Sequence, residues 1–330
     1  MEDKRIKNVS EYVEEICEVQ KNYIHEYSLQ YKTLLFRGQP DVDFPLLPSI
    51  ARDRRNAADI SILNEERNLI EMAKYQMPTI FKKDLEPIEL LALLQHHGIP
   101  TRLLDVTENS LVALYFACCD EKCIDKDGEV IAFKESQDCI TNYPIIQAIA
   151  DSYRICDGTF VSAWHFVCSA KNFDYFKEQK TEIEMMIKNS EVDYIAGRRS
   201  VVDGWIESAF KPPLFIYAPF SSLRQKLQQG RYILFYNSVK RTGEETVEIE
   251  KIIREIPKDH DCIAARIQVA AEAKEEILRQ LSFFGISRKT LFADNTDIVC
   301  EEIKKDAMVR IESTDERYLG NDDIKHRVFA

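Results

Sequence analysis

The stretch that decides the fold is QHHGIPTRLLDVT, residues 95–107. Gly98 and Pro100 end the apolar helix that precedes it, and apolar residues interrupted by polar ones follow as far as Thr107. Two other stretches share this character, LLFRGQP at residues 34–40 and RQKLQQGRY at residues 224–232. Burial of an arginine or a histidine without a partner costs several kcal/mol. We therefore expect the three stretches to converge on one polar pocket.

Around these stretches, helical patterns dominate the beginning and the middle of the chain, and short strand patterns are scattered between them. The pattern shows no regular alternation of strand and helix, so the sequence predicts an α+β fold, a mixed sheet with flanking helices. We expect five parts: an N-terminal helix (1–30), the first half of a core (31–139), a helical insertion (140–211), the second half of the core (212–310) and a charged tail (311–330).

The composition disfavours several classes of protein. An apolar content of 45% in 330 residues is typical of a chain that buries a large core. The formal net charge of −12 disfavours a nucleic-acid surface, which needs excess lysine and arginine. The nine cysteines lack zinc-ligand spacing, so we expect free thiols, no metal and a cytoplasmic location. No signal region and no run of about 18 apolar residues occurs, so we expect no membrane segment.

The first polar stretch offers a candidate anion contact. Arg37 follows a strand-like apolar run, and Gly38 lets the backbone approach a ligand closely. The planar guanidinium fork suits a phosphate or a carboxylate, and Gln39 adds hydrogen-bonding capacity. The alternative is an arginine that pairs with a core carboxylate such as that of Asp105.

The second stretch gathers candidate ligand contacts within a short segment. They are His97, Thr101, Arg102, Asp105 and Thr107. The helix that begins near Thr107 also offers free N–H groups to an anion. The alternative is local structure, in which Thr107 caps that helix and Asp105 holds Arg102 or loop amides.

Later in the chain, Arg224 and Gln228 either point into the pocket or belong to a solvated helix face. Glu248 and Glu250 stand two residues apart, which places both carboxylates on one strand face. Such a pair serves general-base or ribose-binding work, or it is a solvated strand edge. The sequence contains no phosphate-binding Gly-Lys-Ser/Thr loop and no dinucleotide fingerprint.

Together the stretches resemble the FRG domain, which is named after its Phe-Arg-Gly motif. The resemblance rests on FRGQ at residues 36–39, LPSIAR at 47–52, HHGIPTRLLDVT at 96–107 and VALYFA at 112–117. The RQKLQQGRY stretch, Gly285-Ile286 and Thr290-Leu291-Phe292 are similar to the second half of the family. Val106 and Ala293 depart from it, where tryptophan and proline are expected.

The motif order of this family is similar to that of ADP-ribosyltransferases. This resemblance implies a cleft that binds NAD or a related nucleotide, with ADP-ribosyl transfer or NAD cleavage as its activity. Arg37 would hold the NAD phosphates, and Thr101 with Thr107 would order the nicotinamide ribose. Gln228 stands where the transferases carry an acid, so Glu248 or Glu250 would have to supply the carboxylate.

The implied catalytic residues are Arg37, His97, Thr107, Gln228, Glu248 and Glu250. The implied ligand contacts are Arg37, Gly38, Gln39, His97, Thr101, Arg102, Asp105, Arg224 and Gln228. The alternative is a non-catalytic module that senses a nucleotide or a partner in a bacterial defence or toxin system. A protein acceptor or partner fits either function. A carboxylate beside Arg37 would favour the enzyme, and its absence would favour the sensor.

Overall fold

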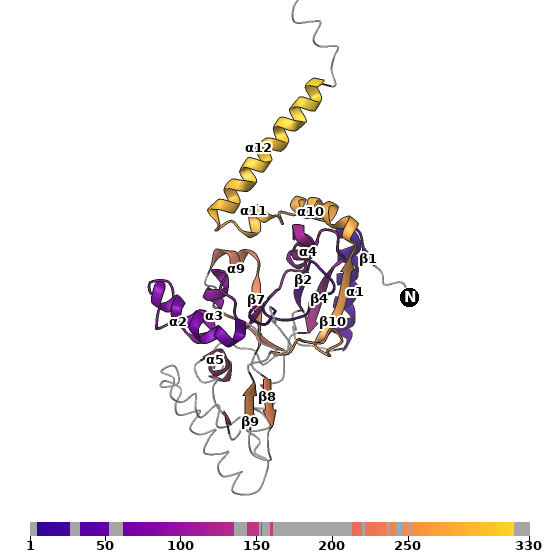
Figure 1. Cartoon of the computed structure of the whole chain (residues 1–330). Coiled ribbons are helices and arrows are strands. Elements are labelled where there is room, and N and C mark those ends of the chain that lie inside the picture. Colours follow the sequence, from indigo (N-terminus) through magenta and orange to yellow (C-terminus); the bar gives the residue numbers. More distant parts are fainter. Residues whose placement is uncertain are drawn as a thin grey trace, which may run out of the picture.

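The computed structural model describes residues 5–26, 34–52, 62–134, 144–151, 153, 159–160, 213–219, 222–235, 238–241, 247–250 and 253–319 (Figure 1). Its central element is a seven-stranded sheet in the order β1-β10-β4-β2-β3-β7-β6. These strands are β1 (Arg5–Ile6), β10 (Ile263–Val269), β4 (Gly128–Lys134), β2 (Leu34–Gln39), β3 (Leu103–Thr107), β7 (Gly230–Leu234) and β6 (Leu214–Ile216). β1 and β10 run parallel and the other neighbours run antiparallel. The expected α+β fold with a mixed sheet is confirmed.

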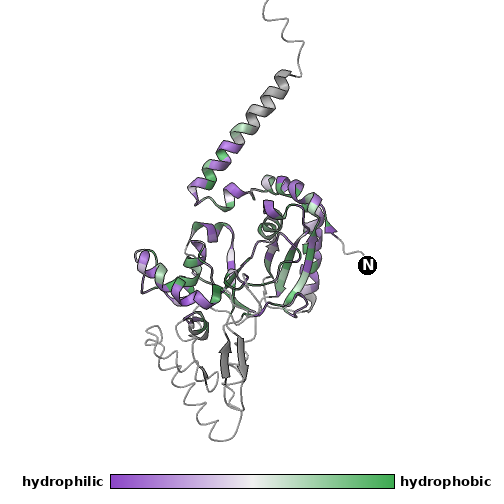
Figure 2. Ribbon diagram, in the orientation of Figure 1, coloured by the Kyte–Doolittle hydropathy of each residue, from purple (hydrophilic) through white to green (hydrophobic). Residues whose placement is uncertain are grey.

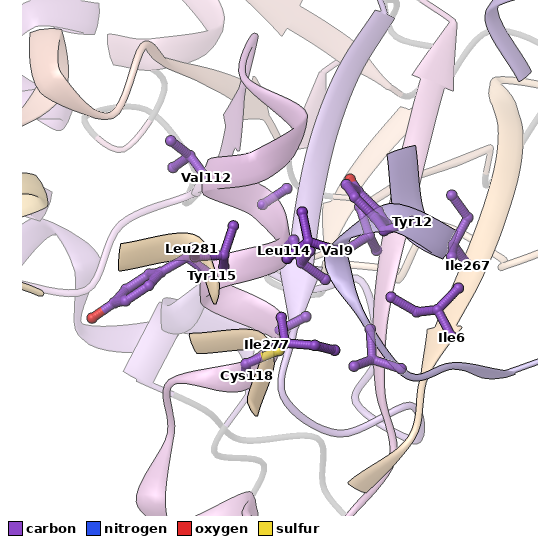
Figure 3. Packing of buried hydrophobic residues seen from close by; sticks show 14 of the residues in the cluster. Ile6, Val9, Tyr12, Val112, Leu114, Tyr115, Cys118, Ile267, Ile277 and Leu281 are labelled. Carbon is purple, nitrogen blue, oxygen red and sulfur yellow. The ribbon is translucent and has the colours of Figure 1, made fainter. Parts of the chain in front are cut away.

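One face of the sheet packs against α1 (Val9–Glu26), α4 (Ser110–Cys118) and α10 (Lys274–Phe283). The Asn109 side chain caps α4 by accepting hydrogen bonds from two backbone N–H groups of its first turn. Because α4 is apolar on nearly all sides, it is buried between the sheet and α10. Figure 3 shows side chains from α1, α4 and α10 meeting β10 in this cluster.

Farther along the same face, α2 (Glu66–Gln76), α3 (Pro87–His96) and α5 (Pro144–Asp151) bury a second apolar cluster against β3, β6 and β7. Pro87 stands in the first turn of α3, where its missing N–H is not needed. Gly98 follows the helix with φ of +80°, a conformation that favours glycine.

The opposite face is covered by shorter segments. They are η1 (Ser49–Ala51), η2 (Ile62–Glu65) and residues 253–256. A bridge between Leu46, which precedes η1, and Ile256 joins two segments over the sheet. Figure 2 shows that the central strands and α4 are largely hydrophobic, which fits a sheet buried on both faces.

The remaining elements lie around this core. They are η3 (Glu121–Cys123), α9 (Leu223–Leu227), η7 (Ala271–Ala273), α11 (Arg288–Leu291), α12 (Thr296–Leu319) and a smaller sheet of β5 (Thr159–Phe160), β9 (Val247–Glu250) and β8 (Ser238–Arg241). α12 extends away from the sheet (Figure 1) and crosses the boundary expected at residue 311. Most of the segment 140–211 lies outside the described residues. No helix of the described part is long and apolar enough to cross a membrane.

Candidate anion-binding site

The three polar stretches lie on or beside neighbouring strands. β2 carries Arg37, β3 carries Asp105, and β7 begins directly after the turn that holds Gln228. β3 pairs with β7 along its whole length, but β2 and β3 share only the pair of Phe36 with Thr107. The two strands therefore separate beyond this pair, along the segment that holds Arg37.

The alternation of side chains divides the predicted residues between the two faces of the sheet. Leu35 and Phe36 belong to clusters on opposite faces, so Arg37 lies on the face of Leu35. Gly38 faces α4 instead, and a Cβ there would lie 1.9 Å from the carbonyl oxygen of Ala113. The packing of α4 accounts for this glycine, whereas the sequence suggested the approach of a ligand.

The guanidinium of Arg37 is only partly satisfied by the protein. Its Nη1 donates to the backbone oxygen of Asp105 at 2.6 Å. Its Nε is buried, and neither Nε nor Nη2 has a hydrogen-bond acceptor among the described residues. The Asp105 carboxylate does not pair with it, because Oδ1 accepts from Gln95 Nε2 at 2.7 Å on the other face. Nε and Nη2 form the edge that binds two oxygens of a phosphate or carboxylate.

A second arginine lies close to the first. Burial lowers the pKa of Arg37 to about 10, and the charge of nearby Arg52 adds to this effect while Asp105 opposes it. Arg52 follows η1, and its Nε donates to the backbone oxygen of Leu47 at 3.0 Å. Two guanidinium groups on one face repel each other, and a bound anion would remove that repulsion.

Gln39 adds an acceptor to the same face. It stands two residues after Arg37 on β2 and is 1% exposed. Its Nε2 donates to the backbone oxygen of Pro45 at 3.3 Å. Its Oε1 is buried and has no hydrogen-bond donor among the residues that the structure describes. On one face of the sheet, β2 therefore carries the Nε–Nη2 edge of Arg37 and the Oε1 atom of Gln39, both without hydrogen-bond partners among the described residues.

The sheet register extends this polar row to a third strand. Val106 of β3 pairs with Arg231 on β7, and Val106 belongs to the same apolar cluster as Leu35. Arg231 therefore lies on the face of the sheet that carries Arg37. Arg231 forms an ion pair with Glu108 at 2.9 Å, and its guanidinium lies 4.6 Å from the ring centre of Tyr217. Glu108 thereby brings a carboxylate to the face of Arg37.

Residues 32–126 match the family model of the FRG domain. The chain carries an FRG domain. Neither the comparison with curated proteins nor the comparison with solved structures finds a match. The FRG domain contains Arg37, Arg52 and Glu108, whereas β7 and Arg231 follow it in the sequence. The FRG resemblance read from the motifs is confirmed, and the similarity to ADP-ribosyltransferases stays a prediction.

His97 of the FRG domain and Arg224 lie in a second polar cluster on the opposite face. The His97 ring packs edge-on against Phe81, with ring centres 5.7 Å apart, and against His96 at 5.0 Å. The Arg224 guanidinium lies 4.4 Å from the ring centre of Phe292. The sheet thus separates two of the predicted ligand contacts from Arg37.

The same cluster contains His96, which is not among the predicted site residues. His96 Nε2 lies 3.8 Å from Oδ2 of Asp294. Burial lowers the pKa of His96, the charges of His97 and Arg224 lower it further, and Asp294 opposes them. The His96 imidazole is therefore biased toward its neutral form.

Arg102 lies in the interior of the protein. It is 0% exposed, and its Nε pairs with Oε1 of Glu66 at 2.6 Å. Its other nitrogens donate to the backbone oxygens of Ile149 at 2.8 Å, Ala150 at 2.7 Å and Phe235 at 3.3 Å. A ligand at the surface cannot reach Arg102, which instead joins α2, α5 and β7 as a structural residue.

Three further predicted contacts also serve local structure. Thr101 is 1% exposed, and its hydroxyl donates to Gln95 Oε1 at 2.5 Å. The Thr107 hydroxyl donates to the backbone oxygen of Gln228 at 2.6 Å, and Gln228 Nε2 donates to the Leu291 oxygen at 3.2 Å. The hydrogen bond from Thr107 connects the FRG domain to the second half of the core.

Glu248 and Glu250 lie on β9, which pairs with β5 and β8 in the smaller sheet and not with the sheet that carries Arg37. Three residues of the Arg37 face were missed in the sequence, namely Arg52, Glu108 and Arg231. Arg52 ends the LPSIAR run and Glu108 directly follows Thr107, so both adjoin the family motifs. Only the sheet register shows that Arg231 joins them.

Neither a metal-ligand cluster nor the thiols of Cys118 and Cys119 offer a reactive centre in the part of the chain that the structure describes. No group of three histidine, cysteine or acidic side chains there could hold a metal ion. Burial raises the pKa of Cys118 to about 12 and that of Cys119 to about 11, with smaller effects from neighbouring charges. Protonated thiols are poor nucleophiles. The polar face around Arg37 is thus the candidate site.

Proposed function

We propose that the FRG domain binds a phosphate-bearing ligand of the nucleotide class, with Arg37 as its principal contact. The observation that carries the proposal is the free Nε–Nη2 edge of a partly buried guanidinium, whose Nε is buried, beside a second arginine. A partly buried charge with one carbonyl partner is costly to the fold, and a bound anion would offset that cost. The planar edge matches two oxygens of a phosphate group.

Within this class we propose NAD or a related dinucleotide. Arg37 and Arg52 together bring two positive charges to one face, which suits a diphosphate better than a single carboxylate. The motif order that resembles ADP-ribosyltransferases supports the same ligand. The geometry favours binding over chemistry at Arg37 itself, because no described carboxylate forms an ion pair with this residue.

A second candidate is NAD cleavage or ADP-ribosyl transfer to a protein, which Glu108 favours. Its carboxylate reaches the face of Arg37 through the ion pair with Arg231. A carboxylate there would stabilise the positive charge that develops on the ribose as the bond to nicotinamide breaks. Glu108 would then take the part that the resemblance assigned to Glu248 or Glu250.

Calorimetric titration tests the binding proposal. NAD, ADP-ribose and inorganic pyrophosphate are titrated into the wild type, Arg37→Met, Arg37→Lys and the matched control Arg279→Met. Arg279 is exposed, and its guanidinium pairs with Glu276 of the same helix. We expect Arg37→Met to abolish binding, Arg37→Lys to weaken it about tenfold because the fork is lost, and Arg279→Met to bind as the wild type does. Equal binding by the wild type and Arg37→Met, or no binding of any probe by the wild type, would overturn the proposal.

Nicotinamide release from NAD, followed by chromatography, decides between the two candidates. An enzyme releases nicotinamide, and Glu108→Gln stops the release while NAD still binds. Release that survives Glu108→Gln and stops in Glu248→Gln or Glu250→Gln would return the catalytic part to the smaller sheet. Binding without release by the wild type leaves the FRG domain as a sensor of its ligand.

A further inference from the structure

A cavity of about 350 Å³ lies at the edge of the face that carries Arg37, between the loop after β2 and the segment before β10. Its volume lies within the range of small-molecule sites, about 300–1,000 Å³. It is lined by Val42, Asp43, Phe44, Pro45, Leu46, Glu255, Ile256, Pro257, Lys258 and Arg266. Neither Arg37 nor Arg52 belongs to this lining, and the cavity meets the Arg37 face where Gln39 donates to the backbone oxygen of Pro45.

One wall of the cavity carries two cations, Lys258 and Arg266, which a buried carboxylate holds in place. Glu129 is 0% exposed, and its Oε1 accepts a hydrogen bond from Lys258 Nζ. Its Oε2 accepts from Arg266 Nε at 2.9 Å and lies 2.8 Å from Arg266 Nη2. Lys258 Nζ also donates to the backbone oxygen of Val42. A buried carboxylate with three contacts therefore fixes both cations, as positioning residues fix a ligand contact.

The cationic wall keeps donors for a further partner. Nη1 of Arg266 has no acceptor among the described residues, and the side chain is 35% exposed beside the cavity. The two cations share the single carboxylate of Glu129, while the exposed carboxylates of Asp43 and Glu255 stand elsewhere in the lining. The Nη1 group of Arg266 can therefore donate to one negatively charged group of a ligand.

The other walls restrict the ligand further. Phe44 presents its ring with 38% of its surface exposed, and the bridge between Leu46 and Ile256 closes the apolar side. Asp43 and Glu255 also line the cavity, and their exposed carboxylates repel a ligand of high negative charge. The walls therefore fit an apolar body that carries a single charge.

We propose that this cavity binds a small organic carboxylate with an aromatic or aliphatic body. The carboxylate accepts hydrogen bonds from Arg266 beside Lys258, and the body lies against Phe44. This proposal does not rest on the proposed function of the Arg37 site, which takes the more highly charged phosphates.

Titration of benzoate into the full chain, followed by calorimetry, tests the site, with benzamide as the neutral analogue. We expect benzoate to bind, and benzamide to bind at least about tenfold more weakly, as one lost charge-assisted hydrogen bond predicts. Arg266→Gln weakens benzoate binding to a similar extent, and Arg37→Met leaves it unchanged. Equal affinity in the wild type and Arg266→Gln, or loss of binding in Arg37→Met alone, would overturn the assignment.

A second variant keeps the test valid if Arg266→Gln disturbs Glu129. Phe44→Trp leaves the charged wall intact and places an indole at the lip of the cavity, where exposure of Phe44 makes the change tolerable. Benzoate is expected to change the fluorescence of this variant in a saturable way, and the wild type, titrated in parallel, gives the background. A signal that does not differ from this background would refute the site.

Discussion

Arg37→Met removes a partly buried charge while it keeps the length of the side chain. Burial is the main cause that lowers the pKa of Arg37 to about 10, and this shift corresponds to about 3 kcal/mol by which the protein disfavours the charged form. The hydrogen bond from Nη1 to the Asp105 oxygen opposes this with about 1.5–3 kcal/mol. The two effects nearly cancel, so we expect the free energy of unfolding to change by no more than about 1 kcal/mol.

Urea unfolding followed by circular dichroism measures this directly. Without ligand, the curves of the wild type and Arg37→Met should overlap within that margin. With NAD or pyrophosphate at about 100 times the dissociation constant, the wild type should gain about 2.7 kcal/mol and the variant nothing. Two unfolding curves for each protein, one with and one without ligand, therefore distinguish an arginine that binds the ligand from one that stabilises the fold.

Two results would refute the reasoning. A loss of more than about 3 kcal/mol without ligand would show that Arg37 acts mainly as a structural arginine, as a broken buried ion pair does. An equal gain of stability in both proteins on addition of ligand would show that the phosphate binds elsewhere. Arg102→Met serves as the positive control for structural loss.

Three further predictions concern the fold. Arg102→Met leaves the Glu66 carboxylate buried without its partner, so the free energy of unfolding should fall by about 3–5 kcal/mol in urea titrations; a fall below about 1 kcal/mol would contradict this. Gly38→Ala places a Cβ 1.9 Å from the backbone of α4, so it should lower the free energy of unfolding by about 3 kcal/mol or prevent folding. In the control Gly230→Ala the nearest neighbour of the new Cβ is 3.4 Å away, so the free energy of unfolding should change by at most about 1 kcal/mol. Similar melting temperatures of the two variants would argue against the close packing at Gly38. The pKa of His96 is lowered from 6.5 in the folded protein, so the unfolded chain binds the proton more readily and the stability of the fold should fall as the pH drops below 6.5. In melting curves taken from pH 7 to 5, His96→Gln should reduce this loss of stability. An unchanged dependence on pH would exclude His96 as its source.

Much of this architecture could be read from local patterns. The α+β class follows from helical and strand patterns that occur without regular alternation, and the apolar run before Cys118 predicts a buried helix because α4 has almost no polar side. Arg37 stood out because a charged group directly follows a strand-like apolar run. The FRG motifs are likewise properties of short segments, so the family could be recognised without a structure.

Residue type and near neighbours in the chain account for the charges and for the short segments that form strands and helices. Contacts between distant segments decide which of these residues meet. Side chains alternate between the two faces of a strand, and the pairing of Phe36 with Thr107 therefore places Arg37 and Asp105 on opposite faces of one sheet. The pairing of β3 with β7 places Arg231, from the second half of the core, on the face of Arg37. Burial of Arg102 likewise depends on α2 and α5. Pairing and burial are set by contacts between distant segments, and no local pattern contains them.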